Sequence, residues 1–466
     1  MSTSGSSISE KLDAYVAGIR PKFEQVLGQM VEIPSISMDP QKRAEMERMA
    51  DYAVGALQEI GAVAEKVTTP GNPVVLGQIV RNPSYPTISI YNHLDVQPAD
   101  GDEWQKPPFV FSVDGDRYNG RGATDDKGPA LAALMAARFA VENDIPVNIQ
   151  FVWELEEEIG SPSFEHFVKA NRLRMPADCV VVSDSIWIAR GKPAIAYGLR
   201  GVQGFSLILE TGTKDAHSGL TGGVARNPLA ELAQIIADCY DVRTGRIKIP
   251  GFYDDVMHAT KKEVDSFVSS GFSLAEFKKA HAFKKIRNLT ASQALKNIFA
   301  LPTFEVHGIV GGYTGPGIKT AIPPRGEAKI SMRLVPNQNC GKIMRLVEKF
   351  IKARNPDVKI VKETSLAPYL GPFGGPYADA GREAMKQAFG REPAFTREGG
   401  SIGAVVTMKN HMITPRQKRG VPVIFLGLSL PEHGYHAPNE CFDWGQASGG
   451  IKMFVHYFDA IASMKK

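Results

Sequence analysis

The chain has 466 residues, of which 43% are hydrophobic and 22% are charged, and its formal net charge is +4. This composition is typical of a folded globular protein, and the length exceeds what one ordinary core holds, so two domains are expected. The small charge and the lack of a Lys/Arg tract with interleaved aromatic residues argue against nucleic-acid binding. No apolar run approaches the roughly 20 residues that span a bilayer, so no membrane partner is expected.

The N-terminal residues and the cysteines indicate a compartment. The stretch MSTSGSSISEKLDAY (1–15) has no basic segment followed by an apolar one, which argues against a secretory signal. The four cysteines, Cys179, Cys239, Cys340 and Cys441, form no C-x-x-C pair and predict free thiols in a reducing environment. The predicted location is the cytoplasm.

The first 200 residues alternate between helical and strand-like segments. Helical periodicity covers 9–31, where Pro21 is expected to interrupt it, and 41–60. Further along, strands are expected at 72–80, 86–92, 109–118, 147–153 and 178–184, with helices at 128–143 and near 163–173. Strands separated by helices indicate βαβ units and a mainly parallel sheet flanked by helices, which is an α/β fold.

After about residue 200 the pattern changes. A strand is expected at 201–213, helices over much of 226–300, a strand at 328–336 and a helix at 340–355. Ile330, Met332 and Leu334 alternate with polar residues in AKISMRLVP, which is typical of a half-buried strand. A helix at 377–389 and a strand at 421–429 then resume the first pattern. The prediction is one α/β domain, residues 1–200 and 372–466, interrupted by an inserted α+β domain, residues 201–371.

Histidines and carboxylates follow the apolar strands of the α/β domain. They are His93 and Asp95 after the strand 86–92, Glu154, Glu156, Glu157 and Glu158 after 147–153, Asp184 at the end of 178–184, His436 after 421–429, and Asp125 and Asp126 before the helix at 128. Ligands of open α/β sheets bind at the carboxyl ends of the strands. Each residue alone is ordinary, as a helix cap, a turn residue or a solvated side chain. Together they predict a site for zinc, manganese or a similar ion.

A serine nucleophile is the rival chemistry. GGSIG (399–403) formally matches G-x-S-x-G, which would make Ser401 the nucleophile. That arrangement requires an acid between the serine and the histidine. Residues 402–432 contain no Asp, and their only Glu is Glu432, beside His433. The sequence therefore disfavours serine catalysis.

Six short motifs occur in a fixed order. They are HLD (93–95), GRGATDDKGP (120–129), EEEIGS (156–161), SDSIWIARGKPAIAYGLRG (183–201), DAHSG (215–219) and HAPNE (436–440). This set resembles the dinuclear metallopeptidase family of carnosinases, cytosolic non-specific dipeptidases, glutamate carboxypeptidases and aminoacylases, from about residue 40 to the end. YGLRG (197–201), KTAIPPR (319–325), MRLVPN (332–337) and REGGSI (397–402) resemble the dipeptidase and carnosinase branch in particular.

The resemblance implies two divalent ions per subunit, zinc or else manganese. It assigns His93 and Asp184 to one ion, Glu158 and His436 to the other, and Asp125 to both. Asp95 would orient the His93 ring, and Glu157 would be the general base that acts on a metal-bridged water. The charges of two divalent ions, three carboxylates and one hydroxide would then sum to zero, as a dry cleft requires.

The resemblance also implies how a small peptide substrate is held. His217 would reach across a dimer interface of the inserted domain to the oxyanion, and Arg333 would bind the substrate carboxylate with help from Thr320 and Ser401. The implied activity is hydrolysis of dipeptides or short peptides with a free C-terminal carboxylate. One alternative is an N-acyl-amino-acid amidohydrolase. Another is a metal-stabilised binding protein that has lost catalysis.

The glutamates at 154–158 carry a structural prediction of their own. Strand alternation would place Glu156 and Glu158 on one face and Glu157 on the other. Since both Glu157 and Glu158 must reach the metals, the strand has to end before Glu157, and the nearby Gly160 fits that end. Glu154 and Glu156 are expected to find solvent or hydrogen-bond partners.

Overall fold

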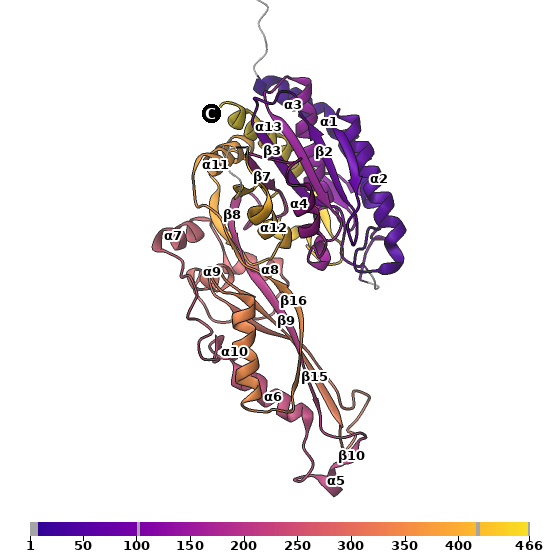
Figure 1. The fold of residues 1–466 in the computed structure, drawn as a ribbon, viewed down its shortest axis with the longest axis vertical. Helices are drawn as coiled ribbons and strands as arrows, with labels where there is room; N and C mark the ends of the chain where they lie inside the picture. The colour runs from indigo at the N-terminus through magenta and orange to yellow at the C-terminus, as the bar shows by residue number, and fades with distance from the viewer. Residues whose placement is uncertain (1–7, 100–102, 416–419, 465–466) are drawn as a thin grey trace, which may run out of the picture.

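The computed structural model describes residues 8–99, 103–415 and 420–464. Figure 1 shows two parts built around separate sheets, with an α/β part at one end and a long antiparallel sheet extending away from it. The predicted fold class, a mainly parallel sheet flanked by helices together with an α+β part, is confirmed.

The α/β part is built on a six-stranded sheet of order β1-β2-β6-β3-β7-β19. Its strands are β1 (Val63–Val67), β2 (Val74–Ile79), β3 (Thr87–His93), β6 (Asn148–Glu154), β7 (Cys179–Val182) and β19 (Val423–Phe425). Strands β6, β3, β7 and β19 run parallel, and β1 and β2 add an antiparallel edge. The carboxyl ends of the parallel strands therefore meet at one edge of the sheet.

Helices cover both faces of this sheet. One core holds residues of α1 (Ile8–Val31), α2 (Arg43–Glu59), α3 (Lys127–Glu142), α11 (Pro376–Phe389) and α13 (Trp444–Ala462), and the other holds residues of α4 (Phe164–Asn171) and α12 (Gly403–His411). Within β3, Ile88 and Ile90 belong to the first core and Tyr91 to the second. Burial on both faces explains why these strands read as continuous apolar runs.

The second part contains a four-stranded antiparallel sheet of order β13-β15-β9-β16. Its strands are β13 (Thr303–Val310), β15 (Arg325–Leu334), β9 (Gly201–Glu210) and β16 (Lys359–Leu366), and its core includes α6 (Pro228–Cys239) and α10 (Cys340–Lys352). The predicted alternation in β15 is confirmed, because Ile330, Met332 and Leu334 are buried while the residues between them are more exposed. Short elements complete this part, namely β10 (Ala216–His217), α5 (Ser218–Thr221), β11 (Tyr240–Asp241), β12 (Arg246–Ile247), α7 (Lys261–Ser269), α8 (Leu274–Ala280), α9 (Ala291–Phe299) and β14 (Ala321–Ile322).

The two chain segments that connect the parts run side by side. β8 (Ala194–Leu199) lies between β17 (Tyr369–Leu370) and β18 (Ala394–Glu398) in a small sheet. Next to it, a Cβ on Gly201 would come within 2.5 Å of the carbonyl oxygen of Leu366, so only glycine allows this approach. The predicted boundaries at residues 201 and 371 lie near this crossing, and the division into domains stays a prediction.

Two local predictions were wrong. The single strand expected at 109–118 is a hairpin of β4 (Ser112–Asp114) and β5 (Arg117–Asn119), because Gly115 takes a φ of 63° and reverses the chain. Pro21 does not interrupt the first helix, since α1 continues through it and buries Val16 and Phe23 on either side. Both helix halves therefore pack against the same core.

All four cysteines are free thiols, as predicted. Within the described residues, none of the helices combines the length and the apolar character needed to cross a membrane.

If the two parts unfold independently, a core substitution in one should leave the other unchanged. Leu207→Ala and Ile90→Ala remove fully buried side chains from different cores, and each should cost its own part about 2–5 kcal/mol. The four tryptophans, Trp104, Trp153, Trp187 and Trp444, all lie outside 201–371. In urea titrations, Leu207→Ala should thus shift the circular dichroism transition but not the tryptophan fluorescence transition. One common transition for both variants would contradict two independent domains.

Candidate metal centre

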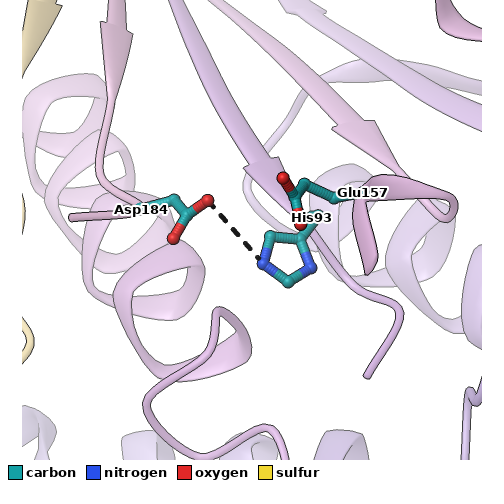
Figure 2. Close-up of side chains that lie close together, drawn as sticks. All are labelled: His93, Glu157 and Asp184. Carbon is teal, nitrogen blue, oxygen red and sulfur yellow. Dashed lines mark ion pairs between the residues drawn. The ribbon is translucent and has the colours of Figure 1, made fainter. Parts of the chain in front are cut away.

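The predicted residues converge at the carboxyl edge of the parallel strands. His93 is the last residue of β3, and Asp184 follows the end of β7 in the chain. Figure 2 shows His93, Glu157 and Asp184 approaching one another from three separate segments. The sheet topology therefore brings together side chains that are far apart in the sequence.

The strand β6 ends before Glu157, at the position that the sequence predicted. β6 ends at Glu154, which pairs with His93, and a 3-10 turn over Glu157–Ile159 follows. Gly160 closes that turn with a φ of 85°. The strand thus ends before Glu157, which confirms the prediction and frees Glu157 and Glu158 from strict alternation.

Asp95 connects this turn to His93. Its carboxylate accepts the backbone N–H of Glu157 at 3.2 Å and that of Glu158 at 3.1 Å. Its backbone carbonyl oxygen lies 3.1 Å from His93 Nδ1. Asp95 therefore fixes the His93 ring and also the turn that carries Glu157 and Glu158. The sequence predicted its role at His93 but not its role in holding the turn.

Asp125 lies at the middle of the cluster. Its Oδ1 is 3.0 Å from His93 Nε2, and its Oδ2 is 3.1 Å from His436 Nε2. His436 Nε2 is in turn 3.2 Å from Glu158 Oε2, and His93 Nε2 is 3.9 Å from Asp184 Oδ2. Each oxygen of Asp125 thus faces a different histidine.

These side chains form two groups with metal-ligand chemistry. Ligand atoms lie within 4.8 Å of one another in the group His93, Glu157 and Asp184 and in the group Asp125, Glu158 and His436. All six offer imidazole nitrogen or carboxylate oxygen, the donors that suit zinc and manganese. The residues present therefore fit two divalent ions. Glu157, which was expected to stay unligated, shares a group with His93 and Asp184, and the individual roles stay predictions.

The electrostatics of the cluster favour added positive charge. Burial raises the pKa of Asp184 to about 7, and the nearby Asp125 and Glu158 carboxylates add to the rise. Burial likewise raises the pKa of Glu157 well above its usual value. Burial alone would lower the pKa of His436, but Asp125 and Glu158 overcome it and raise that pKa to about 11. Buried carboxylates this close together need cations between them.

Glu440 holds the Asp125 loop, and sequence reasoning did not single it out. It is fully buried and accepts the backbone N–H groups of Gly122, Thr124 and Asp125 at 2.9–3.1 Å. Arg121 Nη1 donates to the same carboxylate at 2.8 Å. The available signal was the motif HAPNE, in which Glu440 follows His436.

The remaining acids of the stretch have hydrogen-bond partners, as predicted. Glu154 accepts from the Tyr91 hydroxyl and from Ser161, and burial raises its pKa to about 8. Glu156 accepts the backbone N–H of Asn72 at 2.6 Å and that of Ser163 at 3.0 Å. These two acids stabilise the local fold.

One cavity of about 840 Å³ connects this cluster to Arg333 and Ser401. Arg333 Nη1 donates to Ser401 Oγ at 2.9 Å, and Ser401 donates to the backbone oxygen of Arg200. The hydroxyl thus bonds to arginines and not to a histidine, which agrees with the case against a serine nucleophile.

Arg200 is a second guanidinium in the cavity that the sequence did not reveal. Its Nε donates to the Gly399 oxygen at 3.0 Å, and its backbone N–H donates to the Gly400 oxygen at 3.0 Å. Burial lowers the pKa of Arg200 to about 10, and the positive charge of Arg333 adds to this effect. Arg200 therefore positions the loop that carries Ser401 and makes this end of the cavity positive.

His217 and Thr320 lie elsewhere in the same protomer. Both are exposed, at the far tip of the second part where Figure 1 labels β10 and α5. They are neighbours there, because Ser218 donates its backbone N–H to the Thr320 oxygen at 3.0 Å and His217 pairs with Ala321. Neither residue lines the cavity of its own chain.

Several known proteins are similar to this chain in sequence and in fold. Peptidase family M20/M25/M40 matches residues 89–460. The chain is 33% identical to human Beta-Ala-His dipeptidase over 98% of its own length and 94% of that protein, and 33% identical to the Cys-Gly metallodipeptidase dug1 of Schizosaccharomyces pombe over 98% of both. The solved structure of the dipeptidase Dug1p from Saccharomyces cerevisiae superposes with a TM-score of 0.86 at 29% identity, over 99% of both chains.

The protein therefore belongs to peptidase family M20/M25/M40. The resemblance to the dipeptidase and carnosinase branch is confirmed, and the protein is an enzyme of the metallopeptidase class.

Because Asp125 faces both histidines, its loss should affect both proposed ions. Asp125→Ala is expected to reduce bound metal from two ions per chain to fewer than one after dialysis, measured by elemental analysis. Glu165→Gln, an exposed carboxylate that pairs with Lys169 outside the cavity, is the control and should keep both ions. Loss of only one ion in Asp125→Ala would contradict a shared ligand.

Proposed function

We propose that the protein hydrolyses dipeptides or short peptides with a free C-terminal carboxylate, with two divalent ions as cofactors. One observation carries this proposal: a single cavity joins the carboxylate–histidine cluster to the Arg333–Ser401 pair. A substrate with a scissile carbonyl at one end and a carboxylate at the other fits these two chemistries.

His93 and Asp184 would hold one ion, Glu158 and His436 the other, and Asp125 both. When bound, such ions polarise the scissile carbonyl and lower the pKa of a water molecule. We favour zinc, with manganese as the alternative, because imidazole and carboxylate suit both ions. Asp95 keeps the His93 ring and the backbone of the glutamates in place.

Glu157 is the proposed general base. It lines the cavity, and burial raises its pKa well above the usual range of a carboxyl group. Glu157 would take a proton from the attacking water and pass it to the amine that leaves, which completes hydrolysis of the amide bond.

The positive end of the cavity selects the substrate's carboxylate. Arg333 can form two parallel hydrogen bonds with a carboxylate, and Ser401 supplies another polar atom. The relatives named for Beta-Ala-His and Cys-Gly dipeptides favour a dipeptide over an N-acyl amino acid. All of the predicted catalytic residues are present, which disfavours a binding protein that has lost catalysis.

We further propose a homodimer that forms through the inserted segment. Three large apolar side chains, Leu220, Val224 and Ile318, are 85–93% exposed near the tip that carries His217 and Thr320. A partner would cover this surface. His217 and Thr320 would then enter the partner's cavity together, the first to stabilise the oxyanion and the second to help hold the substrate carboxylate.

The cytoplasm is the proposed location. It rests on the four free thiols, which persist in a reducing compartment.

Glu157→Gln should bind both ions and lose hydrolysis, because glutamine cannot accept the proton. A decrease in kcat of about 10²–10⁴-fold is expected for a lost general base. The measurement is dipeptide turnover beside metal content, with the zinc-loaded and chelator-treated parent enzyme as references. Full activity after complete metal removal would refute metal dependence, and lost metal in Glu157→Gln would identify Glu157 as a ligand instead of a base.

Mixing two inactive variants tests the proposed role of His217. In a dimer of one His217→Ala chain and one Glu157→Gln chain, the site of the first chain keeps its own Glu157 and receives an intact His217 from its partner. Refolding an equimolar mixture should restore activity at up to one site in each mixed dimer, whereas each variant alone stays inactive. No recovery in mixed dimers that are shown to form would contradict action across the interface.

A further inference from the structure

Part of the cavity wall is apolar and comes from the segment around α8 and α9. We call it the aromatic wall and define it by the cavity-lining residues Phe272, Phe277, His281, Phe283, Ile298 and Phe299. No role in binding metal or substrate carboxylate accounts for these side chains. Such a surface beside a proposed peptide site requires its own explanation.

Four rings of the wall follow one another in a chain of contacts. Ring centroids are 5.4 Å apart for Phe272 and Phe277, 4.5 Å for Phe277 and His281, and 5.6 Å for His281 and Phe283. Burial lowers the pKa of His281, which favours the uncharged form of its ring. The wall therefore presents aromatic faces without a formal charge.

The lysines of this segment lie outside the cavity lining. The lysines of α8 and of the turn after it are exposed, and none of them lines the cavity, namely Lys278, Lys279, Lys284 and Lys285. A surface segment with its lysines outward and its aromatic residues toward a cavity is amphipathic. In a cavity that also contains Arg200 and Arg333, this arrangement separates an apolar region from the carboxylate-binding end.

The wall begins beside the carboxylate-binding end. A Cβ on Gly399 would lie 3.6 Å from Ile298 Cγ2 and 3.0 Å from Arg200 Nη2. Gly399 also accepts the hydrogen bond of Arg200 Nε and is near Ser401 in the chain. Ile298 is therefore next to the loop that presents Ser401 to Arg333. A substrate whose carboxylate is on Arg333 has its C-terminal residue at this position.

We infer that the aromatic wall is a subsite for the side chain of the substrate's C-terminal residue, and that it selects large apolar or aromatic side chains. This inference rests on the proposed function, since it uses Arg333 as the carboxylate anchor. Phe283 is 46% exposed, so a bound side chain would cover apolar surface that is now open to water. A C-terminal glycine or serine would leave this apolar surface open to water and gain nothing from it.

The first test compares dipeptides with the metal-loaded enzyme. Values of kcat/KM for Ala-Phe and Ala-Leu should exceed those for Ala-Gly and Ala-Ser by about ten- to a hundredfold, as expected for burial of one large apolar side chain. The reversed pair Phe-Ala and Gly-Ala should differ much less. A preference that follows the N-terminal residue instead, or equal values for all C-terminal residues, would overturn the inference.

Variants assign the preference to the wall. Phe277→Ala and Phe283→Ala should each lower the Ala-Phe to Ala-Gly ratio of kcat/KM by about fivefold or more, mainly through the KM of Ala-Phe. Phe350→Ala is the matched control, because Phe350 lies on α10 outside the cavity and stacks with Arg354. Its ratio should equal that of the parent enzyme.

The exposed position of Phe283 keeps this test valid even if Phe277→Ala does not fold. An unchanged ratio in folded Phe283→Ala refutes its part in the subsite. If none of the dipeptides is hydrolysed by the metal-loaded parent, the proposed function fails. If all are hydrolysed at similar rates, only the inferred subsite fails.

Discussion

The carboxylates of Asp125, Glu157, Glu158 and Asp184 lie in one cluster, and their mutual repulsion is the constraint on which the site depends. Burial raises the pKa values of Glu157, Glu158 and Asp184. Such a group is stable only with positive charge between its members. The parallel sheet satisfies the geometric side of this constraint, because its strands bring His93 and the acids to one edge from distant segments. Two divalent ions satisfy the electrostatic side.

Much of this site could be predicted because it depends on strand order and strand ends. Parallel strands end at a common edge, so residues that follow them meet there, as His93 and Asp184 do. The end of β6 before Glu157 could also be predicted, since alternation would otherwise separate two acids that had to act together. In both cases the local pattern and the required chemistry pointed to the same structure.

The residues that escaped sequence reasoning act through backbone groups or through tertiary contacts. Glu440 binds three backbone N–H groups of a loop more than 300 residues away, and Arg200 binds two backbone oxygens. Neither contact leaves a periodic pattern in the sequence. The hairpin at Ser112–Asn119 was missed for a related reason, because one glycine with positive φ outweighed the strand-like composition around it.

The residues of the charged cluster and those of the aromatic wall lie on different elements of the chain. The sheet and the turn after β6 carry the charged cluster, and the buried Asp95 and Glu440 lock those side chains through backbone hydrogen bonds. The aromatic wall instead lies on α8, α9 and the segments beside them, where Phe277 and Phe283 are only partly buried. Substitutions there change the apolar surface without removing a partner from a buried charge. The peptide preference of such an enzyme can therefore change while its metal chemistry is kept, and the cost to stability is small because Phe283 contributes little to the core.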